Sequence, residues 1–452
     1  MKHTVIIGNG ISGVTTARYL RKKSDEQITI ISGETDHFFS RTALMYIYMG
    51  HMKFEHTKPY EDGFWKKNRL DLVRDWVVDV DFDQRVIRLQ SGKEMTYDRL
   101  VLALGSKPNK FGWPGQDLPG VQGLYSFQDL ETLEANTHAW NATKGQGVKR
   151  AVIVGGGLIG VEMAEMLLSR DMAVTFLVRE NRFWGNVLGT QEGEMIARHM
   201  VKHHVDLRLQ TELKEILADE QGRACAVITG SGERIDCSVV GLTAGVSPNI
   251  DLVRNTQLNI DRGILVDPFL ETNIKGVYAL GDCAQFVEPP PGRRPIEQVW
   301  YTGKMMGKAL AETLSGNPTR YAPGPWFNSA KFFDIEYQTY GEVPADPRPG
   351  EKHFWWVHEK GEIGVRVVFE ENGFKFLGIN TFGIRMRHNV MDRWLREERS
   401  VHHVLQHLKD AHFDPEFYRT YEEHILAAFN AGHGTQLQAE KKNWKRILNL
   451  KA

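Results

Sequence analysis

β-Branched, largely apolar runs alternate with helical stretches along the first 180 residues of the chain. Residues 4–7 and 28–31 form two such runs, with a helical stretch over 14–23 between them. The same order returns later, with apolar runs at 150–154 and 174–178. Runs of this length separated by a single helix are typical of buried parallel strands, so the pattern predicts two strand–helix–strand units.

A glycine-rich turn separates the first strand from its helix. This turn reads GNGISG over residues 8–13, and Glu34 follows the second strand. Gly8 is expected to make the tight turn, Gly10 to admit a pyrophosphate, and Gly13 to let helix and strand pack closely. The helix N-terminus offers N–H groups to phosphate, and Glu34 is placed to accept from a ribose hydroxyl. The pattern predicts a dinucleotide site.

A second turn, GGGLIG over residues 155–160, repeats the fingerprint. Two fingerprints predict two dinucleotides, a flavin and a nicotinamide, because the protein supplies no redox-active group of its own. Val178 stands where an acid usually selects NAD. Arg179 and Arg182 would hold a 2′-phosphate, whereas Glu180 would repel it. The choice between NADH and NADPH therefore stays open.

The composition narrows the class of protein. Of 452 residues, 41% are hydrophobic and 25% charged, an ordinary globular balance. Lys plus Arg number 56 against 57 for Asp plus Glu, so the net charge of -1 gives no reason to expect nucleic acid. The three cysteines are too scattered for a disulfide framework or a thiolate metal cage. No run of about 18 apolar residues and no signal segment is found, so we expect no transmembrane segment and a cytoplasmic location.

Three later segments, 97–108 (YDRLVLALGSKP), 245–249 (GVSPN) and 278–284 (YALGDCA), complete a larger pattern. Together with the two fingerprints, they resemble the FAD-dependent pyridine nucleotide–disulfide oxidoreductase family over about residues 1–330. The resemblance implies an α/β fold with two Rossmann-like domains, for FAD and NAD(P), plus a C-terminal α+β interface domain. The implied boundaries are 1–112 and 246–325 for the FAD domain, 113–245 for the NAD(P) domain, and 326–452 for the C-terminal domain with its helical tail.

The segment after Glu34 distinguishes branches of this family. Disulfide reductases place cysteines there, whereas this chain reads HFFSRTAL over 37–44. This stretch resembles the rubredoxin, ferredoxin and nitrite reductase branch, which lacks the redox-active cysteines. The resemblance places Arg41 near the FAD pyrophosphate and Tyr46 where many ferredoxin reductases carry a lysine. Cys283 is interpreted as a small buried thiol.

The resemblance also assigns residues to the cofactors, and none to a catalytic role. Expected FAD contacts are Gly8, Gly10, Ile11, Ser12, Gly13, Glu34, Arg41, Val77, Ala103, Gly105, Gly281, Asp282, Gln298 and Val299. Expected NAD(P)H contacts are Gly155, Gly157, Leu158, Ile159, Gly160, Glu162, Arg179 and Gly245. Asp282 would accept from the ribityl chain, and the helix after Val299 would point its N-terminus at the flavin.

We predict an FAD-dependent oxidoreductase that passes electrons from NADH or NADPH to a small iron–sulfur carrier of the rubredoxin or ferredoxin kind. One alternative is a membrane-surface NAD(P)H:quinone dehydrogenase, which only the basic amphipathic pattern of residues 436–452, suited to peripheral membrane contact, favours. The same pattern also fits a solvated tail or a docking patch for an acidic partner. Another is a nicotinamide-sensing flavoprotein that binds a partner. A homodimer stays open.

Two groups of histidines have helical spacing, His199 with His203 and His403 with His407. Neither group has a cysteine nearby, so both are interpreted as solvated helix faces and no metal is expected. The pair Trp355 and Trp356 is interpreted as sheet packing, because no basic run flanks it.

Overall fold

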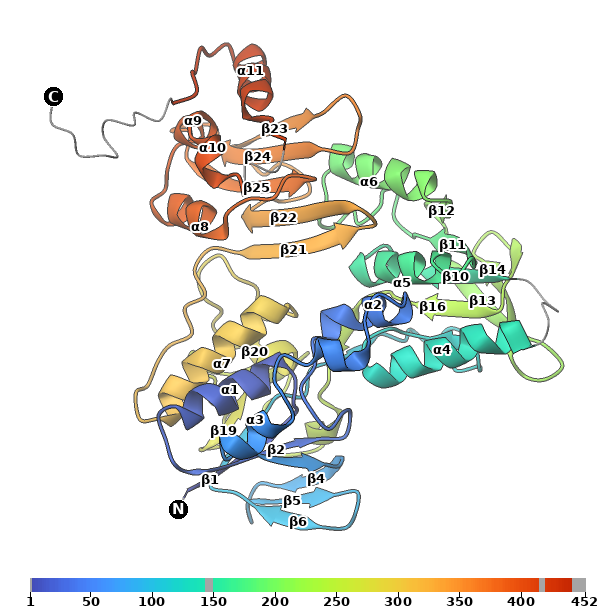
Figure 1. The fold of residues 1–452 in the computed structure, drawn as a ribbon, viewed down its shortest axis with the longest axis vertical. Coiled ribbons are helices and arrows are strands. Elements are labelled where there is room, and N and C mark those ends of the chain that lie inside the picture. Colours follow the sequence, from blue (N-terminus) through green and yellow to red (C-terminus); the bar gives the residue numbers. More distant parts are fainter. Residues whose placement is uncertain (1, 143–148, 414–418, 441–452) are drawn as a thin grey trace, which may run out of the picture. The chain divides into compact units, whose positions relative to one another are not determined.

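The computed structural model describes residues 2–142, 149–413 and 419–440 (Figure 1). The chain forms two compact units. One comprises Met1–Phe183 and Val201–Pro323, and the other comprises Trp184–Met200 and Gly324–Ala452. The sequence did not indicate that residues 184–200 group with the C-terminal part, and the finer domain boundaries remain predictions. None of the helices described is long and apolar enough to cross a membrane.

The first unit is organised around two five-stranded parallel sheets. In each sheet, the strand that precedes a glycine turn lies at the centre, so the turn opens at the carboxyl edge. The first sheet has the order β19 (Val277–Ala279), β7 (Arg99–Leu102), β1 (His3–Ile7), β2 (Gln27–Ser32), β3 (Asp71–Arg74). The second has the order β12 (Val205–Arg208), β11 (Ala173–Leu177), β10 (Arg150–Val154), β16 (Val239–Leu242), β9 (Val121–Gln122).

Helices and smaller sheets cover these two sheets and connect their strands. The helices are α1 (Ile11–Arg21), α2 (Leu44–Tyr48), α3 (Gly63–Lys67), α4 (Phe127–Ala142), α5 (Leu158–Leu168) and α7 (Trp300–Leu314). The smaller sheets are β4 (Val77–Asp81), β5 (Val86–Leu89) and β6 (Glu94–Thr96); β13 (Leu213–Ala218), β14 (Ala224–Thr229) and β15 (Arg234–Asp236); β8 (Ser106–Pro108) with β17 (Val246–Pro248); and β18 (Ile264–Val266) with β20 (Ala284–Phe286).

Two helices far apart in sequence, α1 and α7, pack side by side in the first unit (Figure 1). Glycines in α7 make this approach possible. A Cβ atom added at Gly307 would lie 2.8 Å from the carbonyl oxygen of Ser12 and 2.9 Å from the Cβ of Thr15. Because such distances are shorter than atoms tolerate, a larger residue at position 307 would push the helices apart.

The second unit contains an antiparallel sheet covered by helices. The sheet order is β21 (Phe327–Phe332), β22 (Ile335–Gly341), β25 (Phe376–Phe382), β24 (Gly364–Glu370), β23 (Glu351–Val357). The helices are α8 (His388–Arg396), α9 (Val401–Gln406), α10 (Leu408–Ala411) and α11 (Glu422–His433). Its core gathers Val367, Phe369, Phe376, Met391 and Phe429, which are at most 1% exposed. The two Rossmann-like sheets and this α+β part confirm the predicted fold class.

Helix α6 (Thr190–Lys202) begins within the second unit, where a buried carboxylate anchors it. Glu192 accepts hydrogen bonds from Arg366 (3.0 Å), from Asn380 (2.8 Å) and from the backbone N–H of Gly189 (2.7 Å). Burial raises the pKa of Glu192, while the charge of Arg366 opposes that shift. Removing one partner of such a pair leaves a buried charge uncompensated, so this contact ties α6 firmly to β24 and β25.

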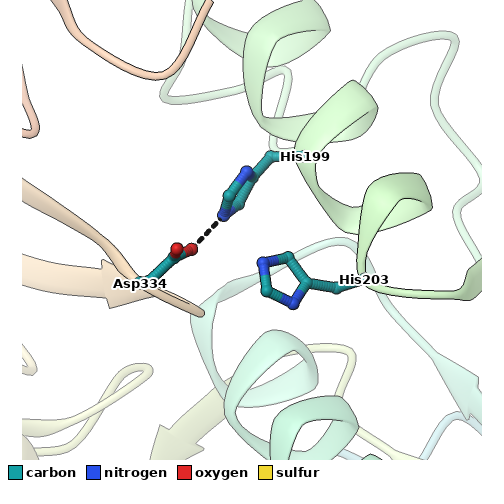
Figure 2. Close-up of side chains that lie close together, drawn as sticks. All are labelled: His199, His203 and Asp334. Atoms are coloured by element: carbon teal, nitrogen blue, oxygen red, sulfur yellow. Dashed lines mark hydrogen bonds and ion pairs between the residues drawn. The ribbon is translucent and has the colours of Figure 1, made fainter.

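Several local predictions in the second unit can be compared with the structure. The sequence pattern of this part predicts strands near 335–341, 364–370 and 375–380, which are found as β22, β24 and β25. It gives no signal for β21 and β23. Trp355 and Trp356 lie in β23, as the sheet-packing interpretation requires. His199 is 3% exposed and hydrogen-bonded to Asp334 (Figure 2), so its assignment to a solvated face is wrong. Of the basic amphipathic pattern over 436–452, residues 436–440 form no helix and residues 441–452 lie outside the described residues.

We expect Gly307→Ala to lower the free energy of unfolding by about 1–3 kcal/mol, because the added methyl group overpacks the α1–α7 contact. Gly63→Ala is the matched control, since a Cβ there meets nothing within 4 Å. Urea denaturation followed by tryptophan fluorescence compares the two variants with the wild type. Equal midpoints for all three proteins would contradict the packing argument.

Candidate active site

In the first glycine turn, neighbouring protein atoms exclude a side chain at two of the glycines but not at the third. Gly8 has φ +113°, and a Cβ there would lie 2.2 Å from the carbonyl oxygen of Ala103. A Cβ at Gly13 would lie 2.2 Å from the carbonyl oxygen of Gly8. At Gly10, however, φ is −71° and a Cβ would meet nothing within 4 Å. Neither backbone strain nor packing requires glycine at position 10, so the open space above it fits a ligand phosphate at the N-terminus of α1.

The second turn repeats this division of roles. Gly155 has φ +118°, and a Cβ there would lie 2.6 Å from the carbonyl oxygen of Thr243. A Cβ at Gly160 would lie 2.6 Å from the ring of Phe176. Gly157 caps α5 with φ −114°, and a Cβ added to it would have no neighbour within 4 Å. The same bare backbone at the start of α5 therefore offers a second phosphate position.

One cavity in the first unit, of about 590 Å³, opens at the carboxyl edge of the β1 sheet. Its volume is in the usual range for cofactor pockets. Of the residues expected to contact FAD, those on its wall are Gly8, Gly10, Ile11, Ser12, Glu34, Arg41, Val77, Ala103, Gly105, Asp282 and Gln298. Gly13, Gly281 and Val299 do not line it. From the second fingerprint, Ile159 and Glu162 reach the same cavity, whereas Gly155, Gly157, Leu158, Gly160, Arg179 and Gly245 do not line it.

An ion pair forms part of the cavity wall. Arg41 donates to both carboxylate oxygens of Glu34, at 2.7 and 2.6 Å, and to the carbonyl oxygen of Tyr125 at 2.6 Å. Its guanidinium also lies 4.6 Å from the centre of the Tyr125 ring. The backbone N–H of Phe127 donates to Glu34 as well (2.9 Å). Glu34 is thus oriented at the end of β2, where a ribose is expected, and Arg41 acts partly by holding it there.

A second polar group surrounds Asp282. Its carboxylate accepts from Ser106 (3.1 Å) and from the hydroxyl of Tyr125 (3.3 Å), and Gln298 donates to Ser106 at 2.7 Å. Desolvation raises the pKa of Asp282. An acidic side chain in such surroundings is suited to accept a hydrogen bond from a polyol chain, as the resemblance implies for FAD. The residues present therefore fit FAD in this cavity.

Ser106, Tyr125 and Trp76 are among the cavity-wall residues that the sequence missed. Ser106 directly follows the predicted contact Gly105 and could have been found by its hydroxyl in the motif. Tyr125 lies in a loop without any recognisable pattern, and its contacts with Arg41 and Asp282 are long-range. Trp76 precedes Val77, and its ring packs over Gly33, where a Cβ would lie 2.0 Å away.

The nicotinamide end is less enclosed. Val178 is buried, whereas the side chain of Arg179 is 72% exposed and pairs with Glu180 at 3.0 Å. Gly245 has φ +84° at the return from the second sheet. Glu162 projects from α5 into the cavity, and desolvation, followed by the nearby charge of Glu165, raises its pKa to about 7.

None of the three cysteines lines the cavity. Cys283 is fully buried behind Asp282, where its thiol lies 3.4 Å from the carbonyl oxygen of Leu102. Burial raises the pKa of Cys283 and that of Cys237 to about 12, so both stay as unreactive thiols near neutral pH. Cys225 lies in β14, outside the cavity wall.

Two parallel sheets, each with an open glycine turn, and one cavity between their fingerprints define a two-dinucleotide flavoprotein fold. The chain belongs to the pyridine nucleotide-disulphide oxidoreductase family, whose family model matches residues 2–307. It is therefore an FAD-dependent NAD(P)H oxidoreductase, and the predicted family and cofactors, FAD with NADH or NADPH, are confirmed.

Individual relatives extend this comparison. Rhodocoxin reductase of Rhodococcus erythropolis is 30% identical over 388 residues, which is 83% of this chain and 85% of that protein. The ferredoxin–NAD(P)(+) reductase of a Sphingomonas species is 31% identical over 346 residues, 75% of this chain and 80% of that protein. The solved putidaredoxin reductase–putidaredoxin complex shares the fold, with a TM-score of 0.77 at 20% identity, over 95% of this chain and 99% of that one.

We expect Gly157→Val to retain FAD but to lose flavin reduction by NAD(P)H, because the side chain fills the space left for the second pyrophosphate. Anaerobic bleaching of the flavin absorbance measures the effect, with dithionite as a reductant that needs no binding site. Gly230→Val is the control, since a Cβ at Gly230 has no neighbour closer than 3.8 Å. Unchanged reduction of Gly157→Val by NAD(P)H would show that the second turn does not hold the nicotinamide cofactor.

We expect Glu162→Gln to become more stable than the wild type as the pH rises. The folded protein holds the pKa of Glu162 near 7, above the ordinary glutamate value of 4.5. The native state therefore binds this proton more tightly than the unfolded chain, and wild-type stability falls between about pH 5 and pH 8. The difference between the two proteins should grow by about 1–3 kcal/mol over that range. Denaturation midpoints at each pH measure it, and a difference between the two proteins that stays constant over that range would contradict this prediction.

Proposed function

We propose that this enzyme passes electrons from NAD(P)H through FAD to a small iron–sulfur carrier protein of the ferredoxin or rubredoxin kind. The observation that carries the proposal is that none of the chain's three cysteines lies on the cavity wall, where a disulfide reductase needs its dithiol. The position is occupied by Phe39, Arg41 and Thr42. Without a dithiol relay, electrons leave directly to an external acceptor.

The relatives support this choice of acceptor. Two relatives, rhodocoxin reductase and the Sphingomonas ferredoxin–NAD(P)(+) reductase, are named after electron transfer with a carrier protein. A rubredoxin-NAD(+) reductase of Acinetobacter baylyi is also 29% identical over 327 residues. The cytoplasm, where NAD(P)H is held and thiols stay reduced, is the compartment that this proposal implies.

Each part of the described cavity has a role in this proposal. Bound FAD would supply the chemistry that accepts a hydride and releases electrons singly. The turn at Gly10 and the start of α1 would hold the FAD pyrophosphate, and Glu34, oriented by Arg41, would accept from the adenosine ribose. Asp282 would accept from the ribityl chain.

The remaining residues would act on the redox side of the cavity. Gln298, just before α7, lies on the cavity wall and donates to Ser106. The positive dipole end at the start of α7 favours negative charge nearby. Glu162 would position the nicotinamide from the second sheet. NADH and NADPH both remain compatible with the exposed pair of Arg179 and Glu180.

Steady-state turnover with different acceptors tests the proposed function. We expect kcat/KM for a small ferredoxin or rubredoxin to exceed that for dioxygen, and for a quinone in liposomes, by at least tenfold. A preference for the liposomal quinone would favour the membrane-surface dehydrogenase. Slow turnover with every acceptor, combined with partner binding that depends on NAD(P)H, would favour the sensing flavoprotein.

We expect replacement of all three cysteines, by Cys225→Ser, Cys237→Ala and Cys283→Ala, to leave carrier reduction within a few-fold of the wild type. The physical reason is that none of these thiols lines the cavity. Each buried replacement is expected to destabilise the fold by about 1 kcal/mol, so the assay is run at low temperature on protein with full FAD content. Loss of carrier reduction in folded, FAD-loaded protein would show that a thiol takes part.

A further inference from the structure

We propose that Trp76 is a positioning residue for the cofactor, whose indole ring stacks on the adenine of bound FAD. Trp76 lies in the connection between β3 and β4, within the first unit, and lines the FAD cavity. The dinucleotide fingerprint assigns no role to this residue. Its role in holding FAD does not depend on which electron acceptor the enzyme uses.

The sheet topology brings Trp76 to the adenosine end of the cavity. Strands β2 and β3 are parallel neighbours, so the segments that follow them leave the sheet at the same edge. Ser32 pairs with Arg74, and the backbone N–H of Asp75 donates to the carbonyl oxygen of Ser32 at 3.1 Å. Trp76 and Glu34 therefore share this part of the wall. Because adenine is bonded to the ribose that Glu34 is expected to hold, the base is expected beside Trp76.

A glycine supports one face of the Trp76 ring. A Cβ atom added at Gly33 would lie 2.0 Å from Cδ2, 2.2 Å from Cε2 and 2.5 Å from Cγ of Trp76. These are adjacent atoms in the middle of the indole, so the backbone of Gly33 lies against the face of the ring and not against its edge. Gly33 is not among the glycines with positive φ. The indole, and not the backbone conformation, is therefore what requires glycine at position 33.

Much of the indole remains uncovered by the protein. Trp76 is 54% exposed although Gly33 covers part of one face. A large apolar ring left in water is unfavourable, and burying it against a ligand recovers that free energy. Every nucleic-acid base has a π face that stacks well on tryptophan. An adenine held at this end of the cavity would cover the exposed part of Trp76.

The backbone around Trp76 is fixed on both sides. Its carbonyl oxygen accepts from the N–H of Gln90 at 2.8 Å, and its own N–H donates to the Asp75 carboxylate at 2.8 Å. The next residue, Val77, begins β4 and pairs with Leu89 of β5. The indole is therefore positioned before the cofactor binds, which lowers the ordering that binding requires.

Cofactor titration of the full-length chain, freed of FAD and kept folded, tests this role. Flavin and tryptophan fluorescence give the dissociation constants of FAD and of ADP, which contains the adenosine half but no flavin. We expect Trp76→Ala and Trp76→Leu to weaken both ligands about tenfold or more, and Trp76→Phe to stay within about threefold of the wild type, because only phenylalanine keeps a stacking ring. Val78→Ala is the matched control, since Val78 is 56% exposed but does not line the cavity.

A double-mutant cycle with Gly33→Ala supplies a second measurement that does not depend on enzyme activity. In the presence of Trp76, the added methyl group displaces the indole, so FAD and ADP should bind about tenfold less tightly. In the Trp76→Ala background the same methyl group no longer meets the ring and should have little further effect. Equal FAD affinity for the wild type and Trp76→Ala would overturn the proposal. So would a loss of FAD affinity without a loss of ADP affinity, or strictly additive effects of the two substitutions.

Discussion

A phosphate bound at a helix N-terminus needs bare backbone beside it, and this requirement organises the first unit of the protein. At Gly8 and Gly155, positive φ angles and carbonyl oxygens within 2.6 Å of a would-be Cβ leave room only for glycine. At Gly10 and Gly157, nothing in the protein requires glycine, yet the space beside each is open. In each turn, the protein itself therefore requires one glycine, Gly8 or Gly155. The space beside the other, Gly10 or Gly157, is left for a ligand.

The FAD cavity depends on contacts that join distant segments. Glu34 and Arg41 are separated by seven residues, but Arg41 also reaches Tyr125, 84 residues away. Tyr125 in turn reaches Asp282, 157 residues further on, and Ser106 links Asp282 to Gln298. Polar groups connected in this way orient one another, so the positions expected to contact the ribose and the ribityl chain are set by a single network.

A buried carboxylate joins residues 184–200 to the C-terminal sheet of the second unit. Glu192 lies on α6, which follows β11 and precedes β12 along the chain. Its carboxylate nevertheless pairs with Arg366 and Asn380 of the C-terminal sheet. A buried carboxylate with three donors is stable only while all of them stay in place. This pairing explains why residues 184–200 group with the C-terminal part, and it also fixes the helix face that carries His199.

The sequence by itself determined the local architecture. Apolar runs of strand length, glycines at fixed spacing and a family-wide order of motifs predicted both parallel sheets and both turns, because these signals depend on neighbouring residues. The FAD contacts of Glu34 and Asp282 stay predictions. Tertiary structure alone decided which side chains complete the cavity and where α6 packs. Tyr125, Arg366 and Asp334 carry no local signal, since each becomes important only through a partner at least 84 residues away. His199 was assigned to a solvated helix face but is buried, for the same reason. The helical spacing predicts which side of α6 carries it, whereas only the tertiary structure shows that this side is covered.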